Sequence, residues 1–249
     1  MNIVVLIAGV HDPKWSIAIS GDKLPEADAD RQIMSPFDEA ALEIALRIRD
    51  ANPETAIQAL VAGGAAGAKI ARAVAAFNPA QVSTVAIDRR WDQSAVSETL
   101  AQLCRDADLI LVGREFGDFD DGLVPSTLAA RLQFEFFARA QLVEAKDGVR
   151  FMRENGGFEE WRALQTPLLV SATNDRRTRL RKPLMKNVML ARQAAITNMN
   201  VAPITPKGLS LVAASERSVS RAPTSCKWID GSYEEQAQAL AALLCEVRA

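Results

Sequence analysis

The fold is decided by residues 109–124, which read LILVGREFGDFDDGLV. The first four residues, Leu109–Val112, form a continuous apolar run, which is typical of a short strand buried on both faces of a parallel sheet. A loop rich in glycine and aspartate follows, and a helical pattern then runs from Leu123 to Leu132. This order predicts that the loop lies at the carboxyl end of a parallel strand, where ligands bind in open α/β sheets.

The acidic side chains of this loop leave its role open. Clustered carboxylates suit a hard cation or the hydroxyls of a ribose, although their spacing is not that of an EF-hand loop. A solvated acidic loop without a ligand is the alternative, because loops carry functional and non-functional polar residues alike. We also expect the helix that begins at Leu123 to offer its backbone N–H groups to a phosphate.

Short apolar runs alternate with helical patterns on both sides of this stretch. Ser35 can cap a helix in which Pro36 takes the first position and Asp38 the place of a capping carboxylate. The alternation predicts a Rossmann-like, doubly wound α/β fold with helices on both faces of a mainly parallel sheet. The expected strands are residues 2–8, 57–62, 82–87, 109–112 and 168–172, and the expected helices begin at Pro36 and span 67–77, 93–105 and 123–132.

Residues 136–164 have a different pattern. Three strand-like runs, 136–144, 149–154 and 158–164, are separated by turn sequences, of which Asn155-Gly156-Gly157 is a strong hairpin signal. We expect these strands to form an antiparallel extension of the main sheet.

We expect the chain to divide into an α/β domain, residues 1–200, and a C-terminal arm, residues 201–249. Within the domain, residues 174–192 carry seven Lys or Arg and a single acid, Asp175. The arm is irregular and rich in Pro and Ser up to residue 231. A helix is expected from about Ser232, with Glu235 completing a capping box and an apolar stripe of Leu240, Leu243, Leu244 and Val247.

Residues 63–67, GGAAG, follow a predicted strand and precede a helix. Backbone N–H groups in such a turn can bind a phosphate, because glycines allow close approach and the helix dipole favours an anion. Ala62 stands where the dinucleotide fingerprint has its first glycine, so a tight strand-to-helix turn without a ligand is an equal alternative.

Composition and motifs exclude several classes of function. The formal net charge of −2 gives no electrostatic case for binding nucleic acid or an anionic membrane. The three cysteines are far apart, which excludes zinc and iron–sulfur sites, and no metal site is predicted. The N-terminus has neither a signal-peptide pattern nor a transmembrane run, so we expect a cytoplasmic protein. His11 is the only histidine, and a hydrolase built around it is the weakest hypothesis because no nucleophile motif accompanies it.

Three blocks of sequence match one known family in order and spacing over nearly the whole chain. Residues 34–43, MSPFDEAALE, are similar to its Asn-Pro-Phe-Asp-Glu helix start, and residues 113–124, GREFGDFDDGLV, to its Gly-Lys-Gln-x-x-Asp-Gly-Asp-x-Gly-Gln-Val loop. Residues 167–172, PLLVSA, the basic segment and residues 187–192, NVMLAR, are similar to a third block. The chain thus resembles the β subunit of electron-transfer flavoproteins, including their nitrogen-fixation-linked relatives.

The resemblance implies a heterodimer whose α subunit holds most of a redox-active FAD. It implies a carrier that takes electrons from a flavin-dependent dehydrogenase and passes them to a quinone reductase or another acceptor. The chain would be no enzyme by itself, since the flavin performs the chemistry. The C-terminal arm and helix would pack on the α subunit.

The resemblance also implies two sets of site residues. The cofactor-binding set would hold AMP, or a second FAD, and comprises Leu6, Ser35, Pro36, Phe37, Asp38, Ala62, Gly113, Arg114, Glu115, Phe116, Asp118, Asp120, Gly122, Leu123 and Val124. The partner-binding set lies in a recognition loop at about residues 173–195 and comprises Leu184, Arg181, Lys182 and Lys186. Ser35 and Leu123 replace an Asn and a Gln of the family, so AMP, FAD and an empty pocket all stay open. The alternative from another class is an adenine-nucleotide-binding regulatory module of universal-stress type.

Overall fold

The computed structural model describes residues 1–17, 29–87, 90–202, 209–213, 215 and 228–246. Its centre is a seven-stranded sheet in the order β12-β5-β4-β1-β6-β11-β7, and every neighbouring pair is parallel. The strands are β1 (Asn2–Ile7), β4 (Ala56–Ala62), β5 (Gln81–Val85), β6 (Leu109–Gly113), β7 (Glu135–Ala140), β11 (Leu168–Ala172) and β12 (Thr197–Met199). The predicted Rossmann-like α/β fold is confirmed.

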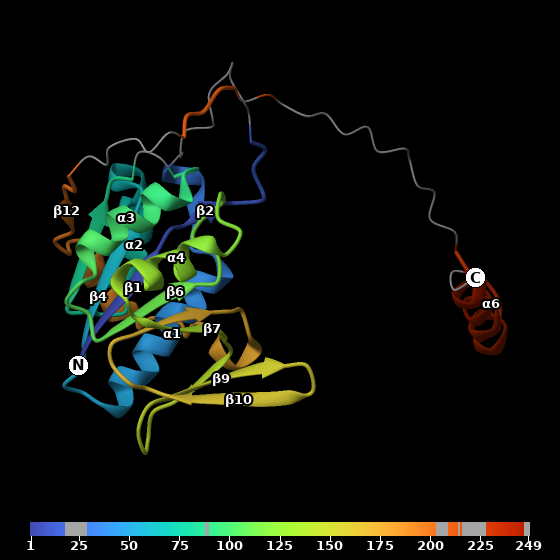
Figure 1. The fold of residues 1–249 in the computed structure, drawn as a ribbon. Coiled ribbons are helices and arrows are strands. Elements are labelled where there is room, and N and C mark those ends of the chain that lie inside the picture. The colour runs from blue at the N-terminus through green and yellow to red at the C-terminus, as the bar shows by residue number, and fades with distance from the viewer. Residues whose placement is uncertain (18–28, 88–89, 203–208, 214, 216–227, 247–249) are drawn as a thin grey trace.

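Helices cover both faces of the sheet (Figure 1). The side chains of Ile3, Val5 and Ile7 pack with α1 and α2 in one core, whereas Val4 and Leu6 pack with α3 and α4 in the other. Successive side chains of β1 point to opposite faces, so its fully apolar sequence serves both cores. The helices are α1 (Pro36–Ala51), α2 (Ala68–Ala75), α3 (Gln93–Leu103), α4 (Leu123–Leu132), α5 (Met185–Ala191) and α6 (Tyr233–Glu246), with 3-10 turns η1 (Ala29–Arg31), η2 (Gly64–Gly67) and η3 (Arg176–Thr178).

The strand order reverses beside β1. The chain runs from β1 to β4 and β5 on one side and then returns to β6 on the other side of β1. The crevice beyond the carboxyl ends of β1 and β6 is therefore the switch point at which α/β sheets bind ligands. A short antiparallel pair, β2 (Val10–His11) with β3 (Gln32–Ile33), follows β1 at this edge.

The expected antiparallel strands are present, but they form a sheet of their own instead of extending the main sheet. Strand β7 joins the main sheet in parallel with β11, and the chain then leaves it to form a separate antiparallel sheet from β8 (Leu142–Glu144), β9 (Arg150–Asn155) and β10 (Phe158–Ala163). The predicted strand 136–144 is interrupted at Gln141, between β7 and β8. Just before the break, Arg139 has a φ of 60° and donates its N–H to the Ser171 hydroxyl, where the pairing of β7 with β11 shifts register. Strands β9 and β10 lie below α1 and β7 in Figure 1.

The sequence did not indicate two elements: α5, within the basic segment, and β12, just after it. Helix α5 is short, and its N-cap residue Leu184 supplies no side-chain cap, so it lacks a start signal. Strand β12 has three residues and pairs only with β5 at the sheet edge.

Helix α6 begins after Ser232, as predicted, and Ser232 and Glu235 bond each other's backbone N–H groups. It stands apart from the α/β domain (Figure 1), and Leu240, Leu243 and Leu244 are each at least half exposed. Part of the predicted arm lies outside the described residues, namely residues 203–208, 214, 216–227 and 247–249, which include Val247. In the described part of the chain, no helix is long and apolar enough to cross a membrane.

Candidate functional site

Three segments that are distant in sequence meet at the carboxyl ends of β1 and β6. The N–H of Gly9, just after β1, donates to the carboxylate of Asp38 in α1 at 3.2 Å. The N–H of His11 donates to Asp118 in the loop after β6 at 2.9 Å. Gly113 packs so closely on α1 that an added Cβ would lie 2.9 Å from the Cβ of Phe37. The structure therefore brings together the predicted segments after β1, at the start of α1 and after β6.

Asp38 is the most deeply buried acid of this edge and is fully shielded from solvent. Its Oδ2 accepts the N–H groups of Gly9 and Ser35, each at 3.2 Å, and the Ser35 hydroxyl accepts the N–H of Asp38 at 3.0 Å. Burial raises the pKa of Asp38 to about 6, although the N–H donors act in the opposite direction. Among the described residues, no hydrogen-bond partner reaches its Oδ1. Asp38 thus joins the end of β1 to the start of α1 and keeps one polar atom unpaired.

Asp120 organises the loop that follows β6. Its Oδ1 accepts the N–H groups of Gly122, Leu123 and Val124 at 3.0, 2.9 and 3.1 Å, and its Oδ2 accepts that of Phe116 at 2.7 Å. The next residue, Pro125, has no N–H to offer. These N–H groups at the start of α4 are therefore already bonded within the chain, in contrast with the expectation that they would meet a phosphate.

The exposed side of the loop carries one cation on an aromatic face. The Arg114 guanidinium lies 4.6 Å from the centre of the Phe37 ring and 2.5 Å from the carboxylate of Glu115. Phe119 and Leu123 of the same loop are 40% and 53% exposed. The exposed side of the loop therefore carries apolar side chains and an Arg114–Glu115 ion pair.

Two predicted residues, Leu6 and Ala62, lie inside the sheet. Both are almost fully buried, so they can contribute to a ligand site through main-chain atoms alone. The turn after Ala62 is tight, because a Cβ on Gly67 would lie 2.8 Å from the Ala62 carbonyl oxygen and Gly63 has a φ of 113°. This close packing by itself requires the glycines at these two positions.

Arg90 is a residue of this edge that sequence analysis missed. Its side chain is partly buried, and burial lowers its pKa while the neighbouring Asp118 carboxylate opposes that shift. Its position shortly after β5, a third parallel strand, is the signal that could have identified it. No three His, Cys, Asp or Glu side chains within the described ranges are grouped as metal ligands would be.

The predicted partner-binding residues fall into two groups. Leu184 and Lys186 lie at the exposed start of α5, where Leu184, Met185, Met189 and Leu190 are 71%, 75%, 53% and 61% exposed. We call Leu184, Met185, Lys186, Met189 and Leu190 the docking surface. Lys182 is exposed nearby, but the guanidinium of Arg181 is turned to its own domain, 3.0 Å from Glu43 and 2.5 Å from Asp50.

The fold and this edge define the class of protein: a Rossmann-like α/β domain with a structured loop at its switch point. The family model of the electron transfer flavoprotein domain matches residues 26–204. The chain belongs to the electron transfer flavoprotein family, on the side of its β subunits. Similar proteins named electron transfer flavoprotein subunit beta are those of Dictyostelium discoideum, 27% identical over 79% of this chain and 80% of the relative, of Bradyrhizobium diazoefficiens, 27% identical over 81% and 82%, and of Bacillus subtilis, 26% identical over 98% and 97%.

Proposed function

We propose that this chain is the β subunit of a cytoplasmic, heterodimeric electron carrier that links a flavin-dependent dehydrogenase to a quinone reductase or another acceptor. The redox group is an FAD held mostly by an α subunit, and this chain has no catalytic side chain of its own. The observation that carries the proposal is the family match over residues 26–204, together with the exposed apolar docking surface on α5. A carrier must bind its partners transiently, and an apolar surface with a basic rim suits that task.

We further propose that the edge at β1 and β6 holds AMP or a second FAD. Two features favour a nucleotide: the Arg114 guanidinium on the Phe37 ring, which supplies a cation and an aromatic face, and the unpaired Oδ1 of buried Asp38. Arg114 would exchange its Glu115 partner for a phosphate, and Phe37 would contact an apolar ring face. When bound, a second FAD would add redox chemistry, whereas AMP would stabilise the fold by binding its native state.

Ligand release from the purified heterodimer tests this site. Denaturation should release one FAD and one AMP per heterodimer, or two FAD and no AMP, and chromatography counts them. A heterodimer with one FAD and no AMP would refute the nucleotide proposal for this chain while leaving the carrier function intact.

A pair of glycine variants tests the placement of the nucleotide. Gly122 and Gly148 have nearly equal φ values, 99° and 101°, so a new side chain strains both backbones alike. Gly122 lies at the start of α4 with the Arg114 carbonyl near its Cβ position, whereas no atom lies within 4 Å of that position at Gly148. Gly122→Val should lower nucleotide content and Gly148→Val should not; equal content in both variants would contradict the placement.

The docking surface is tested by Leu184→Ala, with Phe158→Ala as the control. Both side chains are highly exposed, 71% and 81%, but Phe158 lies on the separate antiparallel sheet. Leu184→Ala should cost about 2 kcal/mol of binding to the dehydrogenase if Leu184 is a hot spot. Thermal stability should not change in either variant, and a matching loss of binding in Phe158→Ala would show that the effect is not specific to α5.

We propose that α6 packs on the α subunit, because its leucine stripe is exposed in the chain alone. Removing residues 228–249 should abolish heterodimer formation in size-exclusion chromatography and leave the melting temperature of the α/β domain unchanged. A truncated chain that still forms the heterodimer with full affinity would refute this role.

A further inference from the structure

The buried carboxylate of Glu43, on α1, binds Arg181 of the basic segment. Glu43 is 3% exposed, and three donors of Arg181 reach it: the backbone N–H at 3.2 Å, Nε at 3.0 Å and Nη2 at 3.0 Å. Arg47, one turn along α1, adds its Nε at 2.9 Å. The remaining Nη1 of Arg181 lies 2.5 Å from Asp50. We call Glu43, Arg181 and Asp50 the clamp.

The clamp keeps its charges at neutral pH. Burial raises the pKa of Glu43, but hydrogen bonds from Arg181 and Arg47 outweigh burial and hold that pKa below its usual range. The hydrogen bonds to Glu43 and Asp50 raise the pKa of Arg181. Because Arg181 binds two carboxylates with a planar, forked group, lysine could not reproduce the contacts.

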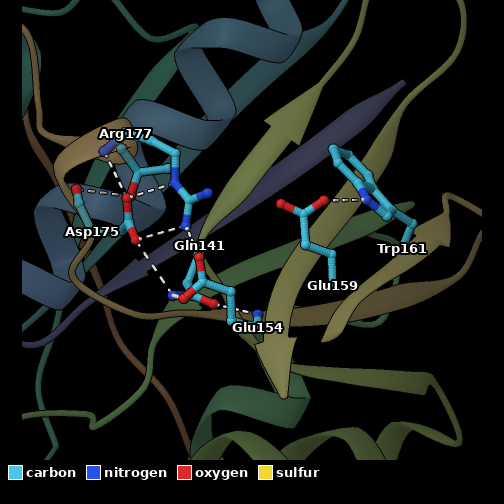
Figure 2. A network of polar contacts seen from close by, with 7 residues as sticks. Gln141, Glu154, Glu159, Trp161, Asp175 and Arg177 are labelled. Atoms are coloured by element: carbon cyan, nitrogen blue, oxygen red, sulfur yellow. Dashed lines mark hydrogen bonds and ion pairs between the residues drawn. The ribbon is translucent and has the colours of Figure 1, made fainter. Parts of the chain in front are cut away.

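A second contact begins at Asp175, six residues before Arg181, and joins the basic segment to the antiparallel sheet. Asp175 accepts the N–H of Arg177 at 2.7 Å, and the Arg177 guanidinium reaches Glu154 of β9 at 2.8 Å. Gln141 bonds Glu154 and, at 3.4 Å, Asp175 (Figure 2). The segment is therefore held to the antiparallel sheet at one end and to α1 just before the docking surface.

The stretch between the clamp and α5 borders an apolar groove. The groove has a volume of about 500 Å³ and lies between this stretch, α1, α2 and α5. Its lining includes Ala73, Phe77, Leu180, Pro183 and Val188. Leu180 packs against the core before Arg181 and α5 contacts α2 after it, so the ionic contacts of Arg181 add a polar restraint between two apolar ones.

We propose that Glu43 and Arg181 are positioning residues for the docking surface and do not touch the partner. They fix the backbone at Arg181, two residues before Pro183. Leu184 and α5 are therefore held in one position, and this segment is already ordered in the unbound protein. A preordered surface binds more tightly because less conformational entropy is lost on binding. The inference rests on the proposed docking function and assigns Arg181 to the clamp instead of to the partner interface.

Two variants weaken the clamp without altering the docking surface. Glu43→Gln removes the buried charge at nearly constant size, and Arg181→Lys keeps the charge but loses the fork. Asp50→Asn is a milder third variant, because Asp50 is half exposed and its loss does not endanger folding. Lys186→Ala is the matched control, since it removes a cation from the docking surface and leaves the clamp intact.

The experiment measures hydrogen exchange and dehydrogenase binding on the intact heterodimer. Glu43→Gln and Arg181→Lys should speed exchange of the amides of residues 179–190 by about tenfold or more, and Asp50→Asn by less, while amides of β1 and β6 keep their rates. Binding should weaken by about tenfold for Glu43→Gln, since the bound conformation is then only partly populated. Lys186→Ala should weaken binding without changing exchange. The double variant Glu43→Gln with Leu184→Ala should bind little worse than Leu184→Ala, because both act on the same surface.

The outcomes separate the inference from the function on which it rests. Unchanged exchange in residues 179–190 of all clamp variants would show that the clamp does not order the segment. Faster exchange with unchanged binding would show that order in this segment does not matter for docking. If Leu184→Ala itself leaves binding unchanged, the docking function fails, and the exchange data still decide whether the clamp positions α5.

Discussion

Replacing Asp120 by alanine should destabilise the protein more than any other single change in the loop after β6. The side chain is 7% exposed and accepts four backbone N–H groups, three of them at the start of α4. Asp120 stands two residues before the N-cap residue Gly122 but bonds the first N–H groups of α4 as a capping side chain does, and loss of such a side chain costs about 1 kcal/mol. The N–H of buried Phe116 would lose its partner as well, which adds about 2 kcal/mol.

The expected loss in the free energy of unfolding is therefore about 3 kcal/mol, or a fall in melting temperature of roughly 9 °C for a chain of this size. Urea unfolding followed by circular dichroism measures the first quantity, and differential scanning calorimetry the second. Asp121→Ala is the control, because Asp121 is adjacent and acidic but exposed, with one bond from Gln93 at 3.3 Å. A loss below about 1 kcal/mol, or a loss equal to that of Asp121→Ala, would show that Asp120 does not organise the loop.

Three further predictions concern the same edge of the sheet. The pKa of Asp38 is about 6 in the folded protein and near the ordinary 3.8 in the unfolded chain. The folded state therefore keeps its proton to higher pH, so the free energy of unfolding should fall by about 3 kcal/mol between pH 4 and 7, at roughly 1.4 kcal/mol per pH unit. In Asp38→Asn, whose side-chain oxygen can still accept from Gly9 and Ser35, urea titrations across that range should lack this fall, and an identical pH profile would contradict the assignment. Gly113→Ala should cost about 2 kcal/mol, because the new Cβ would lie 2.9 Å from the Cβ of Phe37 and 3.3 Å from the Asp38 nitrogen; Gly157→Ala, with open space around it, should cost nothing. Bound AMP should raise the melting temperature of the wild type, and this shift should vanish in Gly122→Val if the nucleotide lies where we propose.

Several features of the fold follow from local sequence. The start of α1 was predictable at Ser35, Pro36 and Asp38, because a capping box requires only residues within one turn of each other. The parallel sheet was predictable from short apolar runs such as Leu109–Val112, since a strand buried on both faces has no polar positions. The helical repeat that begins at Leu123 gave the bounds of α4.

Other features depended on contacts between distant segments. The hairpin pattern of residues 149–164 predicted antiparallel strands, but their separation from the main sheet begins at Gln141, just after β7 shifts register at Arg139 and Ser171. Local sequence does not indicate that shift, because Arg is uncommon at positive φ and adopts it here beside a strand that is distant in sequence. Helix α5 likewise lacks local capping signals.

The candidate site shows the same division. Its member segments could be predicted from the sequence, because the carboxyl ends of neighbouring parallel strands meet at one edge of a sheet. Which charges are already paired could not be predicted, since Asp120 turns back on the start of α4 and Arg181 reaches a carboxylate 138 residues away. Sequence by itself determined the elements and the edge where they converge, because capping, periodicity and strand burial are local. Only the tertiary structure decided which polar groups stay available to a ligand or partner, because a buried charge binds the nearest opposite charge in space, wherever that residue stands in the chain.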